Sequence, residues 1–101
     1  MTSAPSDVLS LVAEVRAKPG KDGELESVLR GLLAPTRREE GCLNYDLHRA
    51  QDDPGFFVLY ENWRTTALWE RHMETPHLAA FMARTDELVA DWTLHRLTRI
   101  G

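Results

Sequence analysis

Two histidines in the second half of the chain are the side chains best suited to acid–base chemistry. His72 follows Leu68 by four residues, so on a helix both side chains face the same side, toward an expected sheet. His77 falls in the first turn of a following helix, where the helix dipole favours a neutral imidazole. A neutral imidazole beside a pocket can act as a general base near pH 7. His72 and His77 are therefore candidate catalytic residues, the alternative being a hydrogen-bonded core position for His72 and an exposed one for His77.

Glu61 is the third candidate catalytic residue. On an extended strand Glu61 and Trp63 share one face, and Tyr60 and Asn62 share the other. If Trp63 faces a pocket, Glu61 is buried with it and needs a partner, such as His72 or Arg64. We expect Glu61 to orient a histidine rather than to act directly.

Aromatic and amide side chains could shape a binding site, although each is equally explained as a core residue. Trp63 could form a wall against a planar substrate, and Trp69 and Phe81 could line an apolar lid. Asn44 and Tyr45 face opposite sides of a neighbouring strand, and one of them could donate a hydrogen bond to a substrate oxygen. The candidate substrate-binding residues are Trp63, Asn44, Tyr45, Tyr60, Trp69 and Phe81.

The sequence predicts no metal site and no cofactor. His72 and His77 are five residues apart across Pro76, which is not the i, i+4 pair that binds metal from one helix face. The chain contains no phosphate-binding loop, no Gly-x-Gly-x-x-Gly and no Cys-x-x-Cys. Cys42 is the single cysteine and reads as a small buried apolar residue.

Composition excludes several classes of protein. The 101 residues suit one domain over 8–101 with a flexible tail over 1–7, and the net charge of −4 argues against nucleic acid as a partner. The longest apolar run, Phe56–Tyr60, is far too short to cross a membrane, and no signal peptide is evident. A cytoplasmic location is the expectation.

The hydrophobic pattern predicts a β-α-β-β-α-β order. That order indicates an α+β, ferredoxin-like split βαβ domain with a four-stranded antiparallel sheet and helices on one face. The expected strands are 8–17, 42–50, 56–63 and 92–100; helices are expected from Lys21 to Gly41 with a break near Pro35, from Thr65, and from Thr75 through Val89.

Several of these strands are apolar on both faces. Val8 and Val12 oppose Leu11, and Phe56 opposes Phe57. Helices on one side can cover only one face, so the other face needs a second layer. We expect a homodimer formed through the open face of the sheet.

Three motifs carry a resemblance to a known family. Gly-Cys-Leu-Asn-Tyr at 41–45, Tyr-Glu-Asn-Trp at 60–63 and His72 followed by Thr-Pro-His at 75–77 resemble the antibiotic biosynthesis monooxygenase family over about residues 8–100. The resemblance implies a dimeric α+β barrel with a pocket between sheet and helices in each subunit. It also implies cofactor-independent oxidation of a small phenol or hydroquinone to a quinone by dioxygen.

Other functions stay open at this stage. An isomerase or lyase acting on a small carbonyl compound could use the same histidines, and Arg49, Arg64, Arg71 and Arg84 could bind a phosphate group. A dimer that binds a small molecule without catalysis is a further alternative. An RNA-binding module shares the element order, but the residue directly before Gly55 is Pro54, not Lys or Arg, and the net charge is negative.

Overall fold

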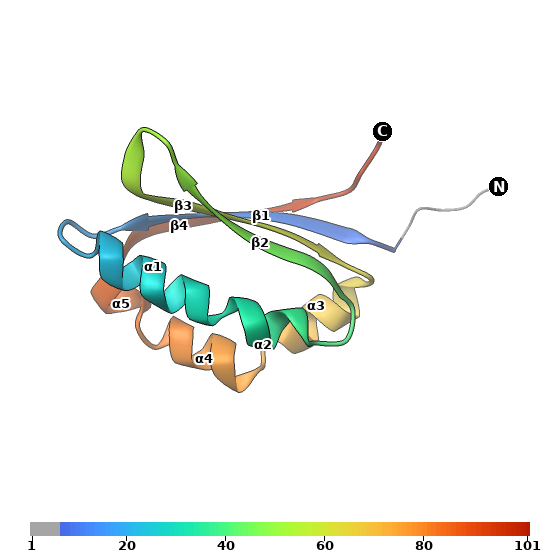
Figure 1. The fold of residues 1–101 in the computed structure, drawn as a ribbon. Helices are drawn as coiled ribbons and strands as arrows, with labels where there is room; N and C mark the ends of the chain where they lie inside the picture. The colour runs from blue at the N-terminus through green and yellow to red at the C-terminus, as the bar shows by residue number, and fades with distance from the viewer. Residues whose placement is uncertain (1–6) are drawn as a thin grey trace.

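Five helices lie on one face of an antiparallel sheet (Figure 1). The computed structural model describes residues 7–101, so the predicted tail falls outside it except for Asp7. The strand order is β2-β3-β1-β4, and within one chain the sheet is open, which confirms the predicted ferredoxin-like fold. The elements are β1 Leu9–Ala17, α1 Asp22–Gly31, α2 Leu33–Arg37, β2 Cys42–Ala50, β3 Asp53–Trp63, α3 Thr66–His72, α4 Pro76–Met82, α5 Thr85–Leu88 and β4 Val89–Leu97.

The central strand β1 shows why the sheet has one buried face. Leu11 and Val15 are buried beneath the helices, whereas Arg16 is exposed on the other side. Leu11 lies opposite Glu61 of β3 and Arg96 of β4, so side chains at the same level of three strands share a face. The structure thus confirms that Leu11 and Val12 of β1 lie on opposite faces of the sheet, as the alternation in the sequence predicts.

The first helical segment breaks near Pro35, as the sequence predicts. α1 ends at Gly31, and α2 begins after Leu32. Pro35 lies in the first turn of α2, where its missing N–H is tolerated, so the break falls just before the proline. Gly41 ends the segment with a φ of +89°.

Both threonines predicted to cap helices do so. The Thr65 hydroxyl accepts a hydrogen bond from the Leu68 N–H at 3.1 Å, and the Thr75 hydroxyl accepts one from the Leu78 N–H at 3.4 Å. Thr75 also donates to the His72 carbonyl at 2.8 Å. One side chain therefore fixes the end of α3 against the start of α4.

The last strand begins before the predicted position. The sequence places it at residues 92–100, but the structure has β4 at Val89–Leu97. Val89 is already extended and pairs with Ala17 beside a register shift in β1. The helical pattern through Leu88 and Val89 misled the prediction because α5 is a single turn of four residues.

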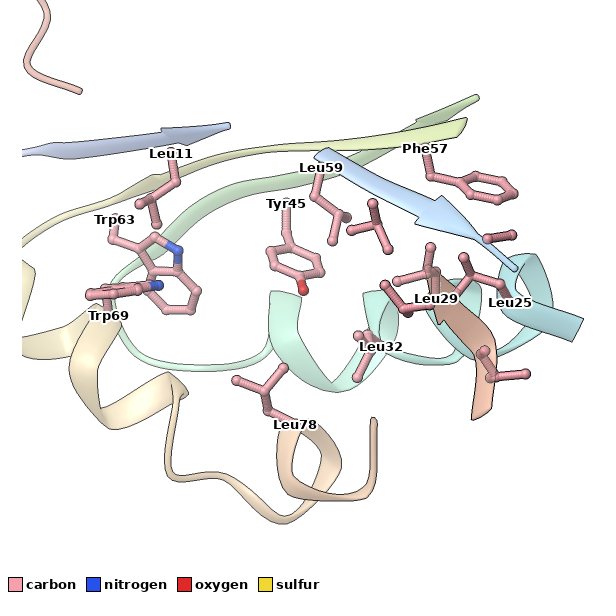
Figure 2. Close-up of a cluster of buried hydrophobic side chains, with 14 of the residues drawn as sticks. Leu11, Leu25, Leu29, Leu32, Tyr45, Phe57, Leu59, Trp63, Trp69 and Leu78 are labelled. Carbon is pink, nitrogen blue, oxygen red and sulfur yellow. The ribbon is translucent and has the colours of Figure 1, made fainter. Parts of the chain in front are cut away.

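The core lies between the sheet and the helices. Tyr45 and Leu59 point from the strands toward α1 and α2, and Trp63 meets Trp69 of α3 (Figure 2). No helix of the described residues 7–101 is long and apolar enough to cross a membrane. A cytoplasmic location stays a prediction.

The other face of the sheet carries no helix and is partly apolar. Val12 and Val58 lie near its centre and are half-buried, while Tyr60 and Leu97 are exposed. A groove with a volume of about 870 Å³ crosses this face, lined among others by Asn44 and Tyr60. We call this surface the open face.

We predict that Gly41→Ala lowers the free energy of unfolding by about 2–4 kcal/mol. A Cβ atom there would lie 2.5 Å from the Leu68 side chain, and the positive φ adds backbone strain. Urea denaturation measures the change. Gly31→Ala is the matched control because a Cβ at Gly31 meets nothing within 4 Å. Equal stability of the two variants would contradict the prediction.

Candidate active site

A cavity of about 110 Å³ lies between the sheet and the helices. We call it the inner cavity. Leu59, Leu78, Phe81 and other apolar side chains form most of its wall. Among the described residues lining it, only Tyr45, Glu61 and His72 carry ionisable groups. Such a cavity can hold a small apolar ligand and present it to a few polar atoms.

His72, the last residue of α3, is buried in this wall with 2% of its surface exposed. Its Nδ1 atom lies 2.8 Å from the Glu39 Oε2 atom. Its ring centre lies 4.8 Å from that of Trp63, and the Tyr45 ring meets it edge-on at 5.6 Å. Burial lowers the pKa of His72, and the hydrogen bond to Glu39 opposes that shift.

The same carboxylate oxygen also binds His77. The His77 Nε2 atom lies 2.6 Å from Glu39 Oε2. When both imidazoles are neutral, each donates one N–H to this oxygen, so the proton sits on Nδ1 of His72 and Nε2 of His77. No partner among residues 7–101 occupies Nε2 of His72, which is therefore the acceptor available to a ligand in the inner cavity.

A tight turn holds Glu39 in position. Its backbone N–H donates to the Thr36 carbonyl at 3.0 Å, and its carbonyl accepts from the Cys42 N–H at 3.2 Å. The Gly41 carbonyl then accepts from the Arg64 N–H at 2.8 Å, which joins the turn to the end of β3. Glu39 is thereby brought to α3 and α4 by the α2–β2 connection. We call Glu39, His72 and His77 the Glu39 cluster.

Glu61 is buried in β3, 5% exposed, and Trp63 is its partner instead of His72 or Arg64. The Trp63 Nε1–H donates to Glu61 Oε1 at 2.9 Å. Burial raises the pKa of Glu61 to about 7; the Trp63 hydrogen bond lowers it, and the Glu39 charge raises it further. Glu61 can therefore be a neutral hydrogen-bond donor near neutral pH.

Cys42 and Tyr45 keep their protons at neutral pH. Burial, with a smaller contribution from the charges of Glu39 and Glu61, raises the pKa of Cys42 to about 11. Burial is also the main cause of a raised pKa at Tyr45. Neither side chain is a nucleophile or base, but the Tyr45 hydroxyl can donate a hydrogen bond.

The structure brings some of the candidate site residues predicted from the sequence to the inner cavity and places the others elsewhere. His72, Glu61, Tyr45 and Phe81 line the inner cavity. His77 is in the Glu39 cluster but is not part of the cavity wall. Trp63 stacks on His72 from outside the cavity, and Trp69 packs below the guanidinium of Arg96 at 4.9 Å. Asn44 and Tyr60 lie on the open face, across the sheet from the candidate base.

Glu39 is the residue that sequence reasoning missed. It lies in the charged run Arg-Arg-Glu-Glu at 37–40, which is typical of a solvated surface. The one sequence feature that could have indicated Glu39 is its position two residues before Gly41, because a turn at this glycine could point the glutamate side chain toward the helices. The sequence predicted no metal site because His72 and His77 alone have the wrong spacing. Glu39 is a third possible ligand, and it comes from a separate segment of the chain.

We predict that Glu61→Gln removes a pH-dependent loss of stability. In the unfolded chain the glutamate has its ordinary pKa of 4.5, and in the folded chain its pKa is about 7. Between these values the folded state keeps a proton that the unfolded state has released, so stability falls as pH rises. Relative to the wild type, Glu61→Gln should gain on the order of 3 kcal/mol from pH 4.5 to pH 8.

Urea denaturation at fixed protein concentration across that range measures the difference. Glu70→Gln is the control, since Glu70 is exposed on α3. Parallel stability curves for wild type and Glu61→Gln would mean that burial does not hold a proton on Glu61.

Comparison with known proteins agrees with this architecture. Residues 8–84 match the family described as antibiotic biosynthesis monooxygenase. The crystal structure of PA3566 from Pseudomonas aeruginosa superposes with a TM-score of 0.92 and 38% identity, covering 98% of this chain and all of that one.

Two curated relatives complete the comparison. The "Probable quinol monooxygenase YgiN" of Escherichia coli is 31% identical over 73% of this chain and 81% of its own. The "Uncharacterized protein sll1783" of Synechocystis is 26% identical over 83% of this chain, which spans only 57% of that protein. With its family match and its fold, the chain belongs to the antibiotic biosynthesis monooxygenase family.

Proposed function

We propose that the chain is a monooxygenase that needs no cofactor and oxidises a small phenol or hydroquinone to a quinone with dioxygen. The observation that carries the proposal is the inner cavity, an apolar space into which His72 brings an imidazole whose tautomer is set by Glu39. The relationship to YgiN, which is named a quinol monooxygenase, supports the substrate class.

Proton removal is the step assigned to His72. With Nδ1–H donated to Glu39, Nε2 carries the lone pair that accepts the phenolic proton. Glu39 stabilises the imidazolium that forms, since its carboxylate lies 2.8 Å from Nδ1. Glu39 is a positioning residue in this scheme.

The phenolate that results can reduce dioxygen without a metal or flavin. It transfers one electron to dioxygen, and the two radicals combine to form a carbon–peroxide bond on the ring. The O–O bond then breaks: one oxygen stays on the ring as the new carbonyl, and the other leaves as water with the ring hydrogen and one further proton. A phenol and dioxygen thus give a quinone and water, and a hydroquinone and dioxygen give a hydroxyquinone and water.

Glu61 and Tyr45 are suited to stabilise charge during these steps. Both line the inner cavity, and both can be neutral donors near pH 7. A donor fixed in an apolar site stabilises a developing oxyanion more strongly than water does. Trp63 holds Glu61 through its Nε1–H, so it acts on the substrate indirectly.

The size of the cavity favours a substrate with a single ring. A cavity of roughly 150 Å³ is enough to enclose benzene. The inner cavity, at about 110 Å³, is smaller than that, so a single-ring phenol would fill it and reach the exposed side chains of Met73, Met82 and Trp92 that border it. A polycyclic substrate would extend past these side chains.

The cavity wall disfavours phosphorylated carbonyl substrates. None of the arginines at 49, 64, 71 and 84 lines the inner cavity. Arg84 pairs with Glu24 and Glu87, and Arg49 with Glu26. Isomerisation of an uncharged carbonyl compound by His72 stays the alternative enzymatic proposal.

Aerobic and anaerobic turnover of hydroquinones by chelator-treated protein tests the proposal. We expect oxygen-dependent quinone formation, faster with single-ring hydroquinones than with an anthrone. His72→Gln should lower kcat by about 10²–10⁴-fold because it removes the base. Oxygen electrode and absorbance measurements follow both reactants.

His95→Gln is the control, because His95 lies on β4 outside the inner cavity and touches Glu14 instead. Wild-type kcat in His72→Gln would exclude His72 as the base. Conversion of a carbonyl substrate without oxygen would favour the isomerase, and absence of any turnover would favour a binding protein.

A homodimer through the open face is part of the proposal. We predict that Val12→Lys, which places a charge near the centre of that face, converts a dimer of twice 11.5 kDa into monomers. Sedimentation at micromolar concentration gives the mass. Ala80→Lys, on the exposed side of α4, should stay dimeric. A wild-type protein that sediments at 11.5 kDa would refute the dimer.

A further inference from the structure

The proposed removal of a proton by His72 gives no role to the contact between His77 and Glu39. A base held by one carboxylate needs one imidazole, yet Glu39 Oε2 accepts from two. His77 comes from the first turn of α4 and is absent from the wall of the inner cavity. Its side chain is 23% exposed, whereas that of Glu39 is 14% and that of His72 is 2% exposed. The Glu39 cluster therefore runs from solvent to the inner cavity.

The donor atoms of the Glu39 cluster are spaced for a metal ion. His72 Nδ1, His77 Nε2 and a Glu39 oxygen all lie within 4.8 Å of one another. Around a tetrahedral zinc ion at roughly 2.1 Å, nitrogen and oxygen ligands lie about 3.4 Å apart. The present separations of 2.8 and 2.6 Å from Glu39 Oε2 need to grow by roughly 1 Å or less.

The separation of the two rings is close to that of two imidazoles on one ion. The centres of the His72 and His77 rings are 6.1 Å apart. Each ring centre lies about 3 Å from a metal bound at its nitrogen, so two imidazoles on one ion have centres roughly 5–6 Å apart. The rings come from different helices, α3 and α4, whose relative position is fixed by Thr75.

The chemistry of the donors selects the kind of ion. Two neutral imidazoles and one carboxylate suit Zn²⁺, Co²⁺ or Fe²⁺ better than Mg²⁺ or Ca²⁺, which prefer oxygen ligands. Three protein ligands leave a fourth position for water, as in catalytic zinc sites. The partly buried carboxylate of Glu39 supplies a negative charge that an incoming cation neutralises.

We propose that Glu39, His72 and His77 bind a divalent transition-metal ion, and that this ion switches off His72 as a base. The metal takes the Nδ1 lone pair of His72, so the proton of the neutral ring moves to Nε2. The His77 proton moves likewise from Nε2 to Nδ1, and no proton is released overall. Nε2 of His72 then donates to the inner cavity instead of accepting from it.

The switching half of this inference rests on the proposed function, whereas metal binding does not. Zinc ions titrated calorimetrically into chelator-treated protein should bind at one ion per chain. Co²⁺ should give a visible ligand-field spectrum typical of nitrogen and oxygen ligands. His77→Gln, which changes the most exposed member of the cluster, should weaken zinc binding by at least about 100-fold.

Glu39→Gln is the second variant, and His95→Gln is the matched control. His95 and Glu14 form another histidine–carboxylate pair, 3.6 Å apart on the open face of the sheet, away from the Glu39 cluster. Unchanged zinc affinity in both cluster variants, or its loss in His95→Gln, would overturn the site. Thermal unfolding of each variant shows whether a loss of affinity reflects misfolding.

The tautomer change has a readout that needs no substrate. Long-range ¹H–¹⁵N NMR spectra should show the His72 proton on Nδ1 in the metal-free protein and on Nε2 with zinc. An unchanged His72 tautomer after zinc binds would overturn the switch even where the site exists. In turnover assays, zinc should abolish the activity and a chelator should restore it. Full activity with zinc bound would also overturn the switch.

Discussion

The carboxylate of Glu39 is the interaction on which the candidate site depends. A buried charge is costly unless hydrogen bonds replace the water it loses. Here two imidazole nitrogens provide them, at 2.8 and 2.6 Å from one oxygen. The two hydrogen bonds to this partly buried carboxylate therefore hold the α2–β2 turn, α3 and α4 together at one point. They also fix which nitrogen of each ring carries a proton.

The position of the Glu39 carboxylate is in turn set by residues that have no role in the proposed reaction. Gly41 allows the turn to pass close to Leu68, because a Cβ atom would meet that side chain at 2.5 Å. Thr75 joins the end of α3 to the start of α4. Trp63 contributes twice, since its ring packs on His72 and its N–H binds Glu61. Packing in the core thus orients each ionisable group.

The fold and half of the site were predictable because they follow from local periodicity. Alternation along β3 places Glu61 on the helix side, and the four-residue step from Leu68 places His72 there too. The same alternation puts Tyr60 on the open face, across the sheet from His72. Glu39 was not predictable, because it lies in the turn before Gly41, where no helical or strand period places its side chain beside His72 and His77. The predicted start of β4 was wrong for a related reason, because the single helical turn of α5 is too short to show a helical period.

The partly buried Glu39 and the buried Glu61 differ in the number of hydrogen-bond donors that face them, and this difference gives them different chemical roles. Glu39 has two N–H donors and can serve as a fixed negative charge. Glu61 has one, from Trp63, and burial raises its pKa to about 7, so it can carry a proton. One acid can therefore stabilise a cation at His72 while the other donates to a substrate anion. An apolar cavity that contains both functions can separate a phenolic proton from its oxygen without leaving an unpaired charge.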